Sequence, residues 1–522
     1  MIDTAGAVTA AVQRQPPALP PKDVTTTGHL LPPTVIAPAA SGQRWPVAFQ
    51  WRFFLALLLG LVWIGPAWRD QRALYALLLW DCLALLVWLI DLARLPKPRE
   101  IVVSRRWLDP LSLDIDSRVE LRVANIGTRE VEIVVEDDVP TAMCPTLPKF
   151  TLTIPPQGSA VAAYSVHPTQ RGNMLMGRIF LRYHGPARFA ERWAAVDARQ
   201  TLRIYPNLRE PQRYTLYLTR SRQMEQEKRL KRLVGRGREF ESLREFREAD
   251  ETRDICWTAT ARRGKLISKV YQTERSQSVV LVVDAGRLML ARTRSQESGV
   301  RSQDSGFRSH ESDLTTSQSA HLPTCPPSHL PTAPPLMKLD YAVNAALTLA
   351  HVAQHSGDTT GLLTYGRKLQ SYLPCARGTE HLRHILEQLA LVSGEAVEAD
   401  HALAADSLLA RHRRRSLVVW LTDLAETAAT PDVIEAASRL LSRHLVLFAV
   451  VGEPELRALV ARRPESPAQM YQYVAAQQVI QRRELLLRRM RVQGAIAMEF
   501  LPGRLSPEIV NHYLQIKWKG LL

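Results

Sequence analysis

The sequence predicts an α/β protein in which a doubly wound sheet follows an antiparallel β-sandwich and a two-helix transmembrane hairpin. Three patterns predict this class. Two long apolar stretches lie within residues 47–93, strands of alternating polarity fill residues 101–206, and wholly apolar strands alternate with helical segments from about residue 278 onward. A period of two is typical of half-exposed antiparallel strands. Continuous apolar strands separated by helices are typical of a sheet covered on both faces.

The composition restricts the classes of function. At 522 residues the chain is long enough for two or three domains. The formal net charge of +16 favours an anionic partner, such as a lipid surface or an acidic protein. The basic residues are spread along the chain without a helix-turn-helix or zinc-finger motif, so we expect no nucleic-acid partner. The 5 cysteines occur singly, which favours a reducing compartment and argues against a metal cage or a disulfide framework.

The first part of the chain predicts a tail and a membrane anchor. Residues 1–44 are rich in Pro, Thr, Ala and Val and cannot build a core, so we expect a disordered tail. Within residues 47–93, Phe53–Trp68 and Ala73–Ala93 are each near the length that a bilayer needs. We expect a transmembrane hairpin with Asp81 turned toward the first helix, because a charge is costly at that depth. A buried hairpin in a soluble core is the alternative.

Charge predicts the orientation of this hairpin. The linker Arg69–Arg72 is short, so both ends of the hairpin lie on one side of the membrane. Basic residues are more frequent outside the hairpin, where Arg44 and Arg52 precede it and several Arg and Lys residues follow Arg94. By the positive-inside rule both termini are cytoplasmic, which predicts a protein of the inner membrane with two transmembrane helices.

The remaining chain divides by composition. Residues 101–206 predict the β-sandwich, and residues 207–234 predict a basic helical connector, which either lies on anionic lipid or is an ordinary solvated helix. Residues 235–522 hold a charged segment and the α/β domain. Three Ser-rich heptads and a Pro/Ser/Thr-rich stretch interrupt this domain at residues 292–336, where we expect a disordered insertion.

The charged segment, Gly235–Val270, is called the signature segment below. It mixes Arg, Asp and Glu with Phe and Trp, without a simple periodicity. We expect a short helical or irregular part, then a helix through Ala259 and Ala261, then a strand from Leu266. Arg and carboxylate side chains at this density can form charge-assisted pairs, and a solvated charged surface is the alternative.

The wording "GRGREFESLREFREADETRDICWTATARRGKL" resembles the signature of a bacterial family described as domain of unknown function 58. The matching positions are Gly235, Gly237, Glu239, Phe240, Leu243, Arg244, Phe246, Asp250, Arg253, Ile255, Trp257, Ala261 and Arg262. The resemblance implies a membrane anchor, an immunoglobulin-like β-sandwich and a von Willebrand factor A-like domain. Members are commonly encoded beside MoxR-type AAA+ ATPases, which implies such an ATPase and a client protein as partners.

Von Willebrand factor A domains hold Mg²⁺ with a D-x-S-x-S loop, a Thr and a distant Asp, and the resemblance carries these positions onto Asp284, Thr379 and Asp423. The two Ser positions are Gly286 and Leu288 here, so both hydroxyl ligands are missing. We therefore expect no cofactor, with Mg²⁺ at this degenerate site as the alternative. Capping of the following helices is the structural alternative for the two aspartates.

These observations predict a membrane-anchored cytoplasmic adaptor that binds lipid, a MoxR-type ATPase and a client protein. The residues expected to contact a partner are Glu239, Arg244, Asp250, Arg253, Trp257 and Arg262. No H-E-x-x-H or G-x-S-x-G motif occurs, so we do not expect an enzyme. The alternatives are a hydrolase at the membrane surface, with Cys256 as its nucleophile, and an envelope-associated structural scaffold.

Overall fold

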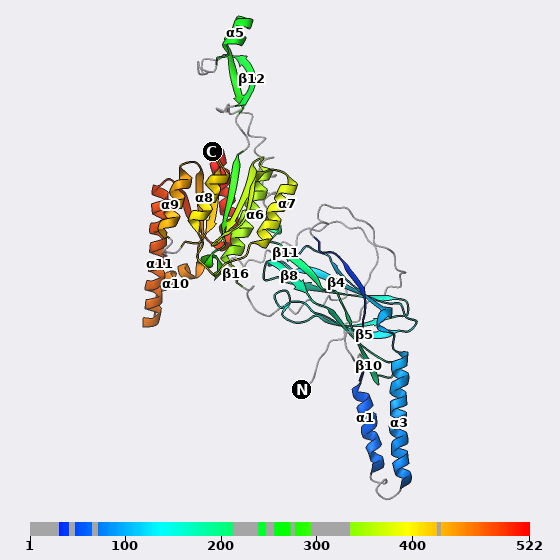
Figure 1. The fold of residues 1–522 in the computed structure, drawn as a ribbon. Coiled ribbons are helices and arrows are strands. Elements are labelled where there is room, and N and C mark those ends of the chain that lie inside the picture. The colour runs from blue at the N-terminus through cyan, green and yellow to red at the C-terminus, as the bar shows by residue number, and fades with distance from the viewer. Residues whose placement is uncertain are drawn as a thin grey trace, which may run out of the picture. The chain divides into compact units, whose positions relative to one another are not determined.

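The computed structural model describes residues 31–40, 47–64, 71–211, 239–246, 255–272, 277–293, 335–424 and 430–521. Two compact units divide these residues, and the chain passes from the first to the second between Ile204 and Tyr205. Figure 1 shows the helices and strands of both. The predicted mixture of α/β and antiparallel β structure is confirmed. The immunoglobulin-like and von Willebrand factor A-like assignments stay predictions.

Unit 1 contains two antiparallel sheets around one core. The first sheet has the order β1 (Val35–Pro38), β3 (Ile101–Trp107), β4 (Ser117–Asn125) and β7 (Ser159–Val166). The second has the order β2 (Val47–Phe49), β10 (Ala190–Val196), β9 (Ile179–His184), β5 (Val131–Asp137) and β6 (Lys149–Ile154). Strands β8 (Gly172–Met176) and β11 (Gln200–Ile204) form a separate pair. Alternate residues of these strands are buried in the shared core, as the period of two predicts.

Two strands lie where the sequence predicted none. Residues 35–38 belong to the expected disordered tail, yet they pair antiparallel with β3, and Ala39 is buried. Residues 47–49 belong to the expected hairpin, yet they pair with β10. Both predictions are wrong for these residues because short segments with Val, Ile and Phe can complete the edges of sheets that the later chain supplies.

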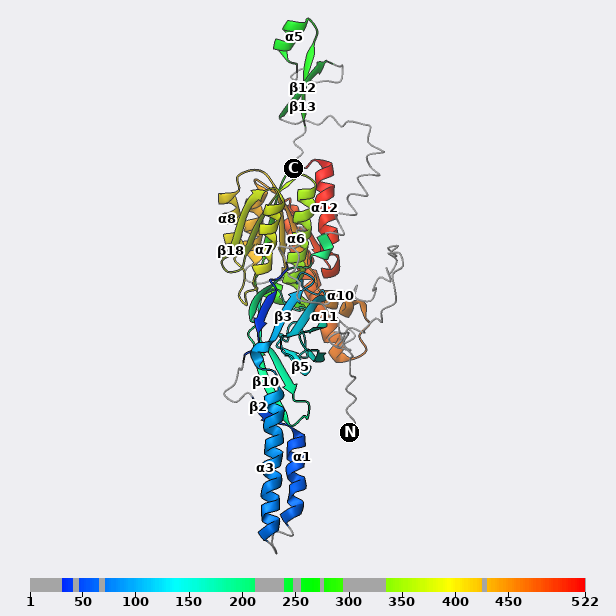
Figure 2. The ribbon, with the colours of Figure 1, turned by 90° about the vertical axis from the view of Figure 1, so that its right-hand side faces the viewer.

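The apolar stretches form helices α1 (Trp51–Gly60), which continues as a 3₁₀ turn to Trp63, and α3 (Gln71–Arg94). They lie side by side below β10 in both views (Figure 1, Figure 2). The stretch Leu74–Glu100 is long and apolar enough to cross a membrane, whereas Trp51–Trp63 is too short for that criterion. The rest of the expected first span, residues 65–68, lies outside the described residues. One candidate span therefore indicates membrane association, and the second span stays a prediction.

Contacts between α1 and α3 involve the polar residues of α3. Trp80 Nε1 donates to the Ala56 carbonyl over 2.8 Å. A side chain at Gly60 would come within 2.6 Å of the Trp80 ring and 3.4 Å of Asp81 Oδ1, so Asp81 lies against α1 as expected. Leu79, Leu86 and other large apolar residues of α3 are more than half exposed. An apolar surface of this extent is typical of contact with lipid or with another protein.

Unit 2 is built on a six-stranded sheet. Its order is β18 (Leu369–Ala376), β17 (Thr359–Tyr365), β14 (Ser278–Asp284), β19 (Leu417–Thr422), β20 (Leu445–Val451) and β21 (Ile496–Phe500). All neighbours pair parallel except β17 and β18. Every residue of β14 and β19 is buried, so both faces of the sheet are covered.

Helices provide that cover. Residues of α8 (His401–Arg411), α9 (Thr430–Leu441) and α11 (Pro467–Val492) share one core with Val280, Trp420 and Phe448. Helix α6 (Lys338–His355) packs on β14 and contacts α7 (Thr379–Leu391) and α12 (Leu505–Lys519). Helix α10 (Pro454–Ala461) precedes α11 and contacts it. These helices are visible around the sheet in Figure 1.

The signature segment differs in part from its prediction. Helix α5 (Trp257–Arg263) and strand β13 (Ile267–Gln272) are confirmed, but the expected helical part is strand β12 (Glu239–Glu245), which pairs antiparallel with β13. The helical expectation is wrong because β13 supplies a long-range partner that local sequence does not reveal. The ends of the expected insertion also differ, since β15 (Arg292–Thr293) pairs with β16 (Leu336–Met337).

One cysteine differs from expectation. Cys144 takes part in a disulfide bond, whereas Cys82, Cys256 and Cys375 are free thiols. The expectation of single, unpaired cysteines is therefore wrong for Cys144, and the argument from cysteine usage for a reducing compartment loses its support.

Candidate functional site

The two candidate aspartates lie at the carboxyl ends of adjacent parallel strands. Asp284 is the last residue of β14 and Asp423 directly follows β19, and both are buried. Thr422 Oγ1 donates to Asp284 Oδ2 over 2.6 Å, and the Gly286 N–H donates to Asp284 Oδ1 over 2.7 Å. Burial raises the pKa of Asp284, because removal from water disfavours its charged form. Each oxygen of the Asp284 carboxyl group thus accepts one hydrogen bond from the protein.

Asp423 is bound by two cations of the protein itself. Lys338 begins α6, and its Nζ donates to Asp423 Oδ2 over 2.6 Å. Arg483 of α11 donates to Asp423 Oδ1 over 3.1 Å. Lys338 also donates to Glu453, which lies at the start of α10, and the lysine side chain is 0% exposed. A buried ammonium is stable only where carboxylates compensate its charge, and these two do so.

Further ion pairs connect Arg483 to β21, the strand at one edge of the sheet. Arg483 donates to Glu499 Oε1 over 2.8 Å, and Arg457 of α10 donates to Glu499 Oε2 over 2.6 Å. Burial alone would raise the pKa of Glu499, but the hydrogen bonds from Arg457 and Arg483 outweigh burial and hold that pKa below its ordinary value. Three cations thus face three carboxylates, and we call these six side chains the Lys338 network. Its members are Lys338, Arg457, Arg483, Asp423, Glu453 and Glu499.

Thr379 does not join the aspartates. It is the exposed first residue of α7, and His381 two residues later bonds the Thr360 carbonyl over 2.7 Å. Thr360 pairs with Val279 near the start of β14, whereas Asp284 ends that strand. Thr379 therefore lies near the amino-terminal ends of the parallel strands, whereas the two aspartates lie at the carboxyl ends. Antiparallel β18 runs back to the amino-terminal ends before α7 begins. The structure therefore brings Asp284 and Asp423 together but does not bring Thr379 to them.

The residues present do not fit Mg²⁺, which needs several free oxygen ligands. All four carboxylate oxygens of Asp284 and Asp423 accept hydrogen bonds from protein donors. A side chain cannot be added at Gly286, where a Cβ atom would lie 2.8 Å from the Ala399 Cβ and 2.9 Å from the Ala399 nitrogen. Among the described residues, no group of three or more His, Cys, Asp or Glu side chains could hold a metal ion.

The sequence signals the buried ion pairing of Arg483 but not that of Lys338. Arg483 carries a charge on the buried stripe of α11 that includes Ala476, Leu487 and Met490, and a charge on such a stripe is a signal of internal pairing. Lys338 gives no comparable signal, because a lysine at the first position of a helix is ordinary.

Four of the six expected partner-binding residues are described, and they lie in β12 and α5. Glu239 and Arg244 belong to β12, whereas Asp250 and Arg253 lie outside the described residues. Trp257 and Arg262 are both exposed on α5, and the Trp257 side chain is 67% exposed. The four described candidates therefore lie in one small element, formed by β12, α5 and β13.

The hairpin has a defined interior. Ile255 and Ile267 are buried, and the Cys256 N–H donates to the Ile267 carbonyl over 2.7 Å. Lys265 Nζ donates to Glu245 Oε1 over 3.2 Å across the pair of strands. Trp257 is therefore exposed on an element that is otherwise organised by burial and backbone hydrogen bonds.

The fold and this site define an α/β protein whose sheet end is closed by its own ion pairs. A family model described as "Protein of unknown function DUF58" matches residues 242–301 and 327–460, which supports the resemblance carried by the signature segment. The matched residues begin within β12 and end within α10. The comparison with curated proteins found no match.

Several solved structures are similar to parts of the chain. The conserved hypothetical protein BatB from Bacteroides thetaiotaomicron is 14% identical over 47% of this chain and 100% of that chain, with a TM-score of 0.27. An uncharacterized membrane spanning protein from Vibrio fischeri is 16% identical over 45% and 95%, with a TM-score of 0.15. The CARDB domain of a Pyrococcus furiosus protein, solved with di-metal ions, is 17% identical over 19% and 83%, with a TM-score of 0.14. At these TM-scores the likenesses add nothing to the assignment of function.

Proposed function

We propose that this protein is a membrane-anchored adaptor that binds other proteins through the β12–β13 hairpin, in partnership with a MoxR-type AAA+ ATPase. The exposure of Trp257 beside Arg262 and Arg263 on α5 carries the proposal. Trp and Arg are the residues in which binding energy is most often concentrated at protein interfaces. A tryptophan that an organised element leaves in water is best accounted for by a partner that covers it.

The membrane anchor is the α1–α3 hairpin, in which we propose two spans with both termini cytoplasmic. The apolar stretch Leu74–Glu100 supports one span directly. Basic residues lie at its C-terminal end, at Arg94, Lys97 and Arg99, as the positive-inside rule requires of a cytoplasmic flank. The protein is then a platform of the inner membrane that presents unit 2 to cytoplasmic partners.

The partner class rests on the family resemblance. The strand order of the six-stranded sheet, numbered within the domain as 3-2-1-4-5-6, supports a doubly wound domain of the von Willebrand factor A-like kind. Because the Lys338 network takes up the carboxylates at the end of this sheet, recognition in our proposal uses no bridging metal. The basic face of α5 instead meets an acidic surface of the ATPase or of its client.

The hydrolase alternative has less support. Cys256 is half-buried, and its Sγ lies 3.4 Å from Thr258 Oγ1, which is not a general base. Ser416 Oγ and His444 Nδ1 lie 3.0 Å apart, but both residues are buried, so a substrate has no access to them.

Binding of the purified MoxR-type ATPase encoded in the same genome tests the proposal. We expect Trp257→Ala in the full chain to weaken binding about thirtyfold or more, because truncation of a central tryptophan costs about 2 kcal/mol or more. The matched control is Trp518→Ala, since Trp518 of α12 is 62% exposed and lies outside the hairpin. Equal affinities of the Trp257→Ala variant and the unchanged protein would remove the hairpin from the interface.

A further inference from the structure

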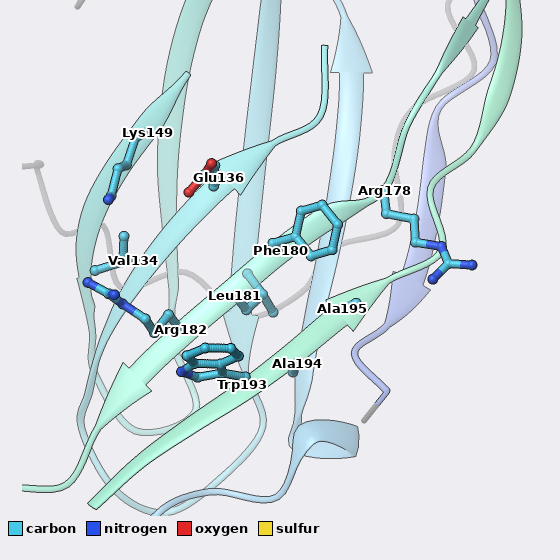
Figure 3. A pocket seen from close by; sticks show the side chains of 10 residues that line it. All are labelled: Val134, Glu136, Lys149, Arg178, Phe180, Leu181, Arg182, Trp193, Ala194 and Ala195. Atoms are coloured by element: carbon cyan, nitrogen blue, oxygen red, sulfur yellow. The ribbon is translucent and has the colours of Figure 1, made fainter. Parts of the chain in front are cut away.

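The outer face of the five-stranded sheet in unit 1 holds a pocket of about 410 Å³, which Phe180 and Trp193 line (Figure 3). Two of its polar side chains already have partners, because Trp193 Nε1 donates to Glu191 Oε1 and Arg182 pairs with Glu191 over 3.3 Å. The first half of α11 in unit 2 is a different kind of surface, because its exposed side chains carry no charge.

Helix α11 is buried mainly in its second half. Its buried residues are Ala476, Arg483, Leu486, Leu487 and Met490. Residues 467–472 are all exposed, and Figure 1 shows this end of the helix extending past the sheet, with α10 beside it. The first half of α11 therefore has little of its own domain to pack against.

The face of α11 opposite its buried residues is apolar. Successive residues of a helix are rotated by about 100°, so Val474 lies on the side opposite Ala476 and Arg483. Met470, Tyr471 and Leu485 share the side of Val474, and these four side chains are 50%, 79%, 54% and 43% exposed in that order. Exposed apolar residues grouped on one side of a helix are typical of a contact with another protein.

This face is also uncharged, since no charged residue occurs between Glu465 and Arg482. The whole chain has a formal net charge of +16, so two copies repel each other unless they meet where charge is absent. The stretch between Glu465 and Arg482 has no basic residue with which to attract an acidic protein or an anionic lipid surface. The same face of a second copy is therefore the partner that suits it.

The two ends of the uncharged stretch have opposite charges. Glu465 lies nine residues before Val474 and Arg482 lies eight residues after it, and both are exposed. In two antiparallel helices that cross at Val474, a residue before the crossing lies beside a residue equally far after it. Each Glu465 then lies near Arg482 of the other copy, and a two-fold axis forms both pairs at once.

We propose that the exposed face of α11 joins two copies of this protein as an antiparallel helix pair with a two-fold axis at Val474. Met470, Tyr471 and Val474 form the apolar centre, and Glu465 and Arg482 set the antiparallel direction. Two helices paired over about four turns form less than a standard interface, so the dimer dissociates in the micromolar range. The inference goes beyond the proposed adaptor role and does not depend on it.

Sedimentation equilibrium of the full chain in density-matched detergent measures this dimer. We expect the unchanged protein to show a reversible monomer–dimer equilibrium in the micromolar range. Val474→Glu should weaken the dimer about a hundredfold, because it places two like charges at the crossing. The matched control is Leu391→Glu, since Leu391 at the end of α7 is 42% exposed, and it should keep the dimer.

Exchange of the end charges tests the antiparallel direction. Glu465→Arg or Arg482→Glu alone should weaken the dimer about tenfold, because each change creates two repulsive contacts across the axis. The double variant Glu465→Arg/Arg482→Glu should restore the dimer, because the ends of the two copies are again opposite in charge. A double variant that dimerises as weakly as the single variants would overturn the proposed pairing.

The remaining outcomes separate the second copy from other partners. A full chain that stays monomeric throughout the micromolar range overturns the dimer. A dimer that Val474→Glu leaves unchanged overturns α11 as its interface. A monomeric chain whose binding to the ATPase is weakened by Val474→Glu would overturn the second copy and identify the ATPase as the occupant of this face.

Discussion

Lys338 contacts Asp423 and Glu453 at the carboxyl end of the parallel sheet, where the family resemblance implied a degenerate magnesium site. The two aspartates could be located from sequence, because each follows an apolar strand. The cation that binds one of them could not, because Lys338 is separated from Asp423 along the chain and only the fold brings them together. The sequence shows that Gly286 stands where the magnesium-binding loop has a serine ligand. Only the structure shows that Ala399 leaves no space for a side chain there.

Lys338→Met should destabilise unit 2 by about 3 kcal/mol, because it leaves Asp423 and Glu453 together with only Arg483 to compensate both charges. Urea unfolding of the full chain, followed by tryptophan fluorescence, measures the change. Lys368→Met removes an exposed lysine and should change the unfolding free energy by about 0.5 kcal/mol or less. A Lys338→Met variant as stable as this control would show that the network contributes nothing.

His444 predicts a pH dependence. Burial, together with the neighbouring His412 and Arg443, lowers the pKa of His444 to about 4. In the unfolded chain the pKa is about 6.5, so the unfolded state binds a proton first as the pH falls. The stabilisation is therefore fully present above pH 6.5 and is lost as the pH falls from 6.5 toward 4.

We expect this histidine to contribute a loss of about 2 kcal/mol in unfolding free energy between pH 7 and pH 4.5. His444→Gln should lack that part of the loss, whereas His384→Gln, which removes an exposed histidine of α7, should keep it. Parallel pH profiles of the unchanged protein and the His444→Gln variant would contradict the assignment.

At the scale of elements, the continuous apolar strands were the easiest to predict from the sequence. Strands β14, β19 and β20 are among the continuous apolar strands that the sequence predicts from about residue 278 onward, because buried parallel strands contain little besides Val, Leu and other apolar residues. Strand β18 was missed, since its residues are only half-buried at the sheet edge and show no apolar run. Strand β12 was missed for a different reason, because its pairing partner is distant in sequence.

The β-sandwich of unit 1 contains a buried polar cluster that joins its two sheets. Arg105 of β3 donates to Asp137 Oδ2 over 3.1 Å, and Tyr164 of β7 donates to the same oxygen over 2.6 Å. Arg105 also donates to the Ala198 carbonyl over 2.9 Å. Burial raises the pKa of Asp137, so the carboxylate depends on Arg105 for compensation of its charge.

Arg105→Met should therefore destabilise unit 1 by about 3–5 kcal/mol, because it leaves a buried carboxyl group without its cation. Scanning calorimetry of the full chain measures this as a lower midpoint for one of its transitions. Replacing the whole cluster, as Arg105→Met/Asp137→Leu/Tyr164→Phe, should restore most of the stability. A triple variant that is as unstable as the single variant would show that the sheets need the ion pair itself.

At the scale of the whole molecule, the chain combines the apolar helices α1 and α3, a β domain and an α/β domain that follows the β12–β13 pair. Sequence patterns gave the order of these parts, because each part has its own hydrophobic period. They did not give the closure of the sheet end, which depends on contacts between α6, α10, α11 and two strands. The central claim is that this sheet end is closed by the protein's own cations and works without a metal.

Calorimetric titration of the full chain with Mg²⁺ tests that claim most directly. The account predicts no binding heat at millimolar Mg²⁺ for the unchanged protein, because the oxygens of Asp284 and Asp423 already accept hydrogen bonds from Thr422, Gly286, Lys338 and Arg483. Binding at millimolar or lower concentration that disappears in the Asp423→Ala variant would contradict it, and would return the sheet end to metal-dependent recognition.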